Sequence, residues 1–94
     1  MMRSEMVRKV CEANPHLSPQ AVEDAIEAIL REIETTLVRG QRIELRGFGN
    51  FFIRHRLARI GRNPKNGNCV SVAAKDVLQF RASRQLLARI NSEG

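Results

Sequence analysis

Residues 54–75 read RHRLARIGRNPKNGNCVSVAAK. Arginines recur at positions 54 and 56, the period-two spacing of side chains that share one face of a strand. Turn-forming residues are concentrated at residues 63–67. After residue 68, apolar residues again occupy every second position. The stretch therefore predicts a β-hairpin arm that runs outward along residues 54–62, turns, and returns along residues 68–75.

The segments that flank the arm carry strand and helix signals. Residues 42–46 alternate strictly between charged and apolar side chains, which predicts a half-buried strand. Residues 47–50 form a tight connection to a second strand over residues 51–56. Phe52 breaks the expected alternation, because it should point to the face that the arginines occupy. After the arm, Ser83 is placed to cap a short third helix.

The N-terminal part has the periodicity of helices. Ser4 is placed to cap a first helix, which ends at Asn14-Pro15 because the residue before a proline avoids the α region. Ser18-Pro19 then begins a second helix, and Gly40 ends it. The apolar stripe of this second helix comprises Val22, Ile26, Ile29, Leu30, Ile33 and Leu37. The two helices predict an antiparallel hairpin.

These elements predict one α+β domain over residues 1–94. Its parts are a helical dimerisation half (1–40), a three-stranded antiparallel sheet (41–82) extended into a long β-ribbon arm at about 54–75, and a C-terminal helix (83–94). The arm leaves about 70 residues for a core, which is marginal for a monomer. We therefore expect an obligate dimer, with the stripe of the second helix as its interface.

The charge is divided unevenly along the chain. Residues 1–38 hold four basic and seven acidic residues, whereas residues 39–94 hold twelve basic and three acidic ones. The net charge of +6 is therefore the sum of −3 for residues 1–38 and +9 for residues 39–94. No acidic residue lies between Glu44 and Asp76, so nothing within the arm neutralises it. This pattern favours a polyanionic partner, although a basic run is often only a solvated surface.

Other classes of function find little support. Cys11 and Cys69 are isolated, and His16 and His55 have no catalytic or metal-binding companions, so we expect no enzyme, no metal, no cofactor and no small-molecule substrate. No apolar run approaches the ~20 residues that span a bilayer, and no secretory leader is visible. We expect a cytoplasmic protein without membrane association.

A basic two-stranded ribbon fits the groove of double-stranded DNA. Arginines can reach acceptors in the minor groove, and a proline ring can wedge between base pairs because it needs no hydrogen-bond partner. Pro64, at the tip of the arm, has the chemistry of such a wedge. From spacing alone, an ordinary turn proline is the favoured interpretation, because proline is common in turns.

Two motifs carry a family resemblance: residues 46–51 (RGFGNF) and residues 61–67 (GRNPKNG). They are similar to the HU and integration host factor family, and the resemblance covers essentially the whole chain. It implies an intertwined dimer, with itself or with a paralogous subunit, that bends DNA in the nucleoid. Chromosome organisation, recombination, replication and transcription control are the processes it implies.

The resemblance also implies roles for particular residues. Pro64 corresponds to the intercalating proline, flanked by minor-groove contacts from Arg62, Asn63 and Lys65. The arm and its base contact DNA through Arg54, Arg56, Arg59 and Lys75. Ser4 and Ser83, beside Arg3 and Arg84, begin helices whose free N–H groups can hold phosphates. Capping of their own helices is the alternative role of both serines.

Arg42, Glu44 and Arg46 allow two interpretations. They can form a surface ion-pair ladder, or they can resemble the β subunit of integration host factor, in which Glu44 would hold Arg46 for sequence-selective readout. The β-subunit interpretation is favoured over a non-specific HU-type homodimer. An RNA-binding protein of ribosomal type is a further alternative, which charge alone does not exclude.

Overall fold

The computed structural model describes residues 1–92. The chain divides into two compact units, residues 1–36 and the residues from Leu37 onward, which are described separately. Within residues 1–92, no helix is both long enough and apolar enough to cross a membrane.

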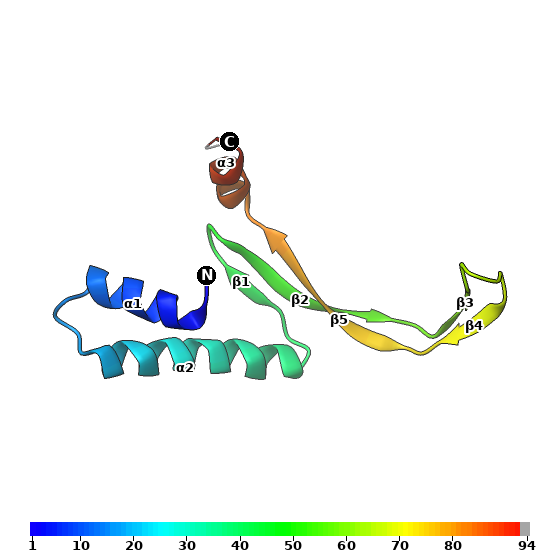
Figure 1. Cartoon of the computed structure of the whole chain (residues 1–94), viewed down its shortest axis with the longest axis horizontal. Helices are drawn as coiled ribbons and strands as arrows, with labels where there is room; N and C mark the ends of the chain where they lie inside the picture. The colour runs from blue at the N-terminus through cyan, green and yellow to red at the C-terminus, as the bar shows by residue number, and fades with distance from the viewer. Residues whose placement is uncertain (93–94) are drawn as a thin grey trace. The chain divides into compact units, whose positions relative to one another are not determined.

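The first unit is a helical hairpin of α1 (Arg3–Ala13) and α2 (Pro19–Val38), which runs just past the end of the unit (Figure 1). As predicted, α1 ends before Asn14, and the Ser18 hydroxyl caps α2 by accepting a 3.1 Å hydrogen bond from the Ala21 N–H. The cap predicted at Ser4 is wrong. The helix already begins at Arg3, because the Met2 carbonyl accepts the first helical hydrogen bonds, and Ser4 lies within the first turn.

Few apolar residues of the helices are enclosed. Val22 and Ile26 on α2 are the only buried hydrophobic residues among residues 1–92. Ile29, further along the same stripe, is 60% exposed, and Leu30 is also exposed. The single chain thus leaves much of its predicted interface stripe uncovered.

The second unit contains a three-stranded antiparallel sheet in the order β1-β2-β5, formed by β1 (Ile43–Leu45), β2 (Gly49–Arg56) and β5 (Lys75–Ala82). Strand β1 is shorter by one residue at each end than predicted. The turn before β2 uses Gly47 at a φ of 83°, a left-handed conformation that glycine adopts without strain.

One face of this sheet is apolar. The register pairs Ile43 with Phe51, Phe51 with Phe80, and Ile53 with Leu78, so their side chains share a face. The Phe80 ring centroid lies 4.7 Å from that of Phe51 and 5.5 Å from that of Phe48. Phe80 nevertheless remains 44% exposed and Leu78 56% exposed.

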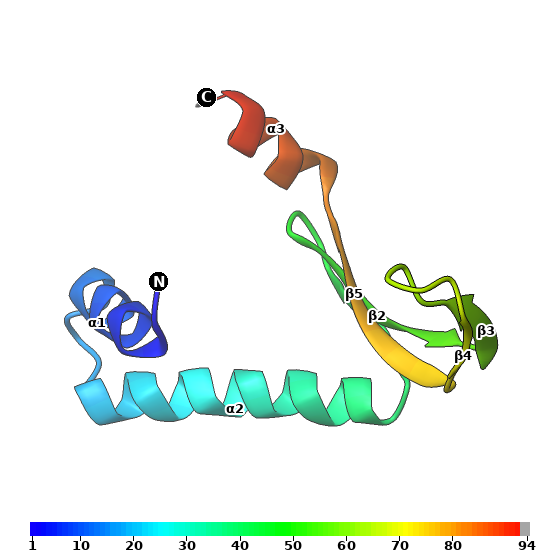
Figure 2. The same ribbon diagram turned by 45° about the vertical axis from the view of Figure 1, so that its right-hand side comes forward.

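The arm is a ribbon in two segments. Its outer segment is a separate two-stranded sheet of β3 (Arg59–Arg62) and β4 (Cys69–Val72). Residues 57–58 and 73–74 separate it from β2 and β5, and the ribbon changes direction there (Figures 1 and 2). Arg56 pairs with Lys75 and Arg59 with Val72, so the register is the same on both sides of the break.

The arm therefore runs along residues 54–62 and 68–75 as predicted, with a break that the sequence analysis did not anticipate. Three of the four residues at the break are alanines, which favour strands weakly and offer little side chain for cross-strand packing. Helix α3 (Arg84–Ser92) follows β5, and the predicted Ser83 cap is confirmed by a 3.1 Å hydrogen bond from the Leu86 N–H to the Ser83 hydroxyl. Residues 93–94 of the predicted helix lie outside the described residues.

Candidate nucleic-acid interface

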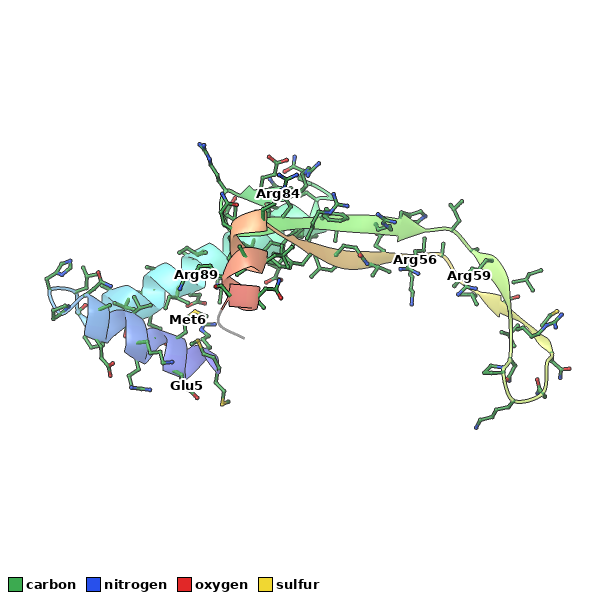
Figure 3. All side chains as sticks on the ribbon, turned by 90° about the horizontal axis from the view of Figure 1, so that it is seen from above. Glu5, Met6, Arg56, Arg59, Arg84 and Arg89 are labelled. Carbon is green, nitrogen blue, oxygen red and sulfur yellow. The ribbon has the colours of Figure 1, made fainter. Side chains whose placement is uncertain are left out.

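The second face of the β1-β2-β5 sheet is charged. The register places Glu44, Asn50 and Arg81 in one cross-strand row, and Arg56 opposite Lys75 at the far end of the sheet. Because alternate residues of a strand share a face, Arg54 lies on this same side. Figure 3 shows Arg56 near the end of this sheet and Arg59 beyond the break. The structure thus places Arg54 and Arg56 on one face, as their spacing predicted, and brings Lys75 to the same face.

Arg81 is a basic residue of this face that was not among the predicted contacts. Its guanidinium carbon lies 5.7 Å from the centroid of the Phe52 ring. Phe52 pairs with Gln79 in the register, so Phe52 does point to the charged face. The period of two from Lys75 through Arg81 is the signal that could have identified this residue.

The outer segment of the arm presents arginines on both of its faces. Arg59 pairs with Val72, and Arg62 pairs with Cys69. Arg59 and Arg62 are separated by an odd number of positions along β3. The two arginines therefore point to opposite sides of the ribbon. Both are exposed, so the outer segment offers positive charge in two directions.

The tip of the arm is a hydrogen-bonded loop. The Asn63 N–H donates to the Asn68 carbonyl and the Gly67 N–H to the Asn63 carbonyl, each at 2.8 Å. The side-chain oxygen of Asn63 accepts a 2.9 Å hydrogen bond from the Lys65 N–H, and that of Asn66 braces Asn68 in the same way. Pro64, between Asn63 and Lys65, is exposed. Asn63 therefore shapes the loop that presents Pro64.

Glu44 forms its ion pair with Arg42, not with Arg46. The Arg42 Nε atom lies 3.2 Å from the Glu44 carboxylate. Within residues 1–92, Arg46 has no ion pair. The structure thus shows the Arg42–Glu44 pair of the surface ion-pair alternative and no ion pair between Glu44 and Arg46.

The two predicted helix N-termini differ in what their serines do. The Ser83 hydroxyl donates a 2.8 Å hydrogen bond to the Gly47 carbonyl while it caps α3, so its proton is already engaged. Ser4 and its neighbour Arg3 are exposed, and Arg3 lies 4.0 Å from Glu27. Arg84, in the first turn of α3, is exposed as well (Figure 3).

At the base of the arm, His55 and Asp76 face each other across β2 and β5. The His55 Nδ1 atom lies 2.7 Å from a carboxylate oxygen of Asp76. This contact was not predicted, and both side chains are exposed. In the described part of the chain, no three histidine, cysteine or acidic residues gather in a way that could hold a metal ion.

Known proteins share this architecture. The chain matches the family described as "Bacterial DNA-binding protein" over residues 1–91. Integration host factor subunit beta from Halorhodospira halophila is 45% identical over 92 residues, which cover 98% of this chain and 90% of that protein. The solved structure of Anabaena HU in a cocrystal with DNA has a TM-score of 0.80 and 30% identity, covering 96% of this chain and 97% of that one.

A mutant HU from Thermotoga maritima has a TM-score of 0.69 at 20% identity, covering 96% of this chain and 99% of that one, which supports the fold alone. The fold and its basic ribbon place this chain in the HU-like class of α+β proteins. The chain belongs to the bacterial DNA-binding protein family. The resemblance seen in residues 46–51 and 61–67 is thereby confirmed, as is the predicted fold class.

Proposed function

We propose that this protein is a non-enzymatic architectural protein that binds the DNA minor groove as a dimer and bends the duplex by inserting Pro64 between base pairs. The observation that carries the proposal is the tip of the arm. Asn63 braces the loop from one side, and the exposed proline ring sits between that asparagine and a lysine. Unstacking one base step costs about a few kcal/mol, which contact between the bent duplex and additional basic surface can offset.

The charges support binding along the length of the arm. Arg54, Arg56 and Lys75 share one face of the sheet, and Arg59 and Arg62 lie on opposite faces of the outer segment. A ribbon that lies in a DNA groove has a sugar–phosphate strand on each side. Arginines on both faces of the ribbon are therefore suited to contact both DNA strands. The protein would act in the nucleoid, where bent DNA serves chromosome organisation, recombination, replication and transcription control.

The uncovered apolar surfaces support a dimer. Ile29 of α2, Phe80 of the sheet and Ile90 of α3 are all exposed in the single chain, and so large an exposed apolar area is typical of an interface. A second copy or a paralogous subunit would cover them. Sedimentation of the purified chain, alone and after coexpression with paralogues, distinguishes these partners, and a monomer at all concentrations would contradict the dimer.

The wedge is tested with Pro64→Ala. Fluorescence energy transfer between dyes at the ends of a short duplex reports the bend, and titration of the same duplex reports affinity. We expect the bend to decrease while phosphate-driven binding persists, since the charges remain. Pro15→Ala, in the loop between the helices, is the matched control and should bend DNA normally. An unchanged bend with Pro64→Ala refutes the wedge, and tighter binding to RNA of equal length refutes DNA as the partner.

A further inference from the structure

Phe52 is the one phenylalanine on the charged face of the sheet in the described chain. Phe80 packs against both Phe48 and Phe51 on the apolar side. Phe52 instead lies between the positions of Asn50 and Arg54 on β2, and it is half-buried. Its ring is therefore not needed for the aromatic cluster of the core.

Arg81 covers this ring. Its guanidinium carbon lies 5.7 Å from the ring centroid, within the range of a cation–π contact. A guanidinium held over an aromatic ring keeps its N–H donors at its edges, where they can form a bidentate contact with a phosphate. The contact with Phe52 thus restricts Arg81 without using its hydrogen-bond donors.

No acidic residue neutralises Arg81. Glu44 lies in the same cross-strand row but is paired with Arg42, and Asp76 is paired with His55. Among residues 1–92, Arg81 has no ion-pair partner. Its positive charge is therefore available to an external anion.

We propose that Phe52 and Arg81 form a platform for the sugar–phosphate backbone of duplex DNA, in which Arg81 binds a phosphate and the Phe52 ring positions Arg81 and packs against the adjoining deoxyribose. The platform lies on the face that carries Arg54, Arg56 and Lys75, so it continues the surface of the arm onto the sheet. The proposal rests on the proposed DNA-binding function and adds a contact at the base of the arm.

The experiment measures the affinity of the full chain for a short duplex over a series of salt concentrations. The logarithm of the binding constant falls with the logarithm of the salt concentration, and the loss of one phosphate contact makes this slope less steep by about one. We expect this change for Arg81→Gln. Lys9→Gln removes one charge from an exposed position on α1 and is the matched control. If Arg81→Gln and Lys9→Gln have the same slope, the platform is refuted.

The role of Phe52 is tested by a double-mutant cycle. We expect Phe52→Ser to weaken binding several-fold, and its effect to shrink when Arg81 is already glutamine, because the positioning role needs the guanidinium. Arg81→Lys should keep the salt slope of the wild type but lose most of the coupling to Phe52, since a lysine lacks the planar fork. Strictly additive effects of the two substitutions would refute the joint platform.

Two controls separate this proposal from the function on which it rests. Chemical unfolding of every variant shows whether the fold is intact, and Phe52→Leu supplies an apolar side chain at that position in case Phe52→Ser unfolds. A wild-type chain that fails to bind duplex DNA refutes the proposed function itself. A wild-type chain that binds and bends DNA, with Arg81→Gln behaving like the control, refutes only the platform.

Discussion

The ring of Phe80 lies directly over Gly49. A β-carbon at Gly49 would stand 2.6 Å from the Cζ atom of that ring and 2.6 Å from the carbonyl oxygen of Arg81. Gly49 is buried and pairs in the register with Ala82, so two small residues make room for the ring at this end of the sheet. The absence of a side chain at Gly49 therefore permits the cluster of Phe48, Phe51 and Phe80.

Gly49→Ala should destabilise the fold by about 1–3 kcal/mol, because one of the three clashing atoms belongs to the backbone and cannot rotate away. Urea unfolding at fixed protein concentration measures the change. Gly61→Ala is the comparison, since its nearest contact is a Val72 methyl at 3.3 Å, a tight contact with a side chain and not with the backbone. The close approach would be unimportant if Gly49→Ala unfolded at the same urea concentration as the wild type.

Ser83→Ala should lower stability by about 1–2 kcal/mol, because it removes the helix cap and the hydrogen bond to Gly47 together. The Gly47 bond ties the start of α3 to the turn before β2. Ser83→Thr retains a hydroxyl and should recover most of the loss. Thermal unfolding followed by circular dichroism compares the two, and equal melting temperatures for Ala and Thr would contradict the role of the hydroxyl.

The sequence predicted the start of α2 correctly, because this boundary depends on local chemistry. The start of α2 at Ser18-Pro19 follows from a side-chain oxygen and a preset backbone angle, and both are properties of single residues. The break in the arm could not be found in this way. Residues 57–58 and 73–74 keep the register of the ribbon, so their periodicity is indistinguishable from that of a continuous ladder.

Charge and spacing predicted the shared face of Arg54 and Arg56, whereas Lys75 entered the candidate site only through the family resemblance. The period of two places Arg81 on the face of Lys75, but its contact with Phe52 depends on the pairing of β5 with β2, and pairing is a long-range property. The partner of Glu44 was likewise assigned to Arg46, although an i, i+2 arginine lies on each side of it. Sequence spacing cannot choose between two equivalent neighbours, and the structure selects Arg42.

Asn63→Ala should loosen the tip of the arm and reduce the DNA bend. The substitution removes the acceptor for the Lys65 N–H, a hydrogen bond worth about 0.5–1.5 kcal/mol to the loop conformation. A smaller fraction of the molecules then holds Pro64 in the loop conformation that the hydrogen bond stabilises. The average DNA bend should therefore decrease without a comparable loss of affinity. Asn68→Ala is the control, because the tip uses only the backbone of Asn68. A normal bend with Asn63→Ala would show that the asparagine does not position Pro64.

Glu44→Gln should raise affinity for random-sequence duplexes more than for a preferred site selected from a random pool. The carboxylate holds Arg42 at 3.2 Å, and a released Arg42 can reach phosphates of any sequence. Competition titrations with the two duplexes measure the ratio of affinities, which should fall. Glu32→Gln, on the exposed side of α2, controls for the loss of one negative charge. If both affinities rise in equal proportion, Glu44 acts only through its charge, and the contact with Arg42 has no part in selecting the sequence.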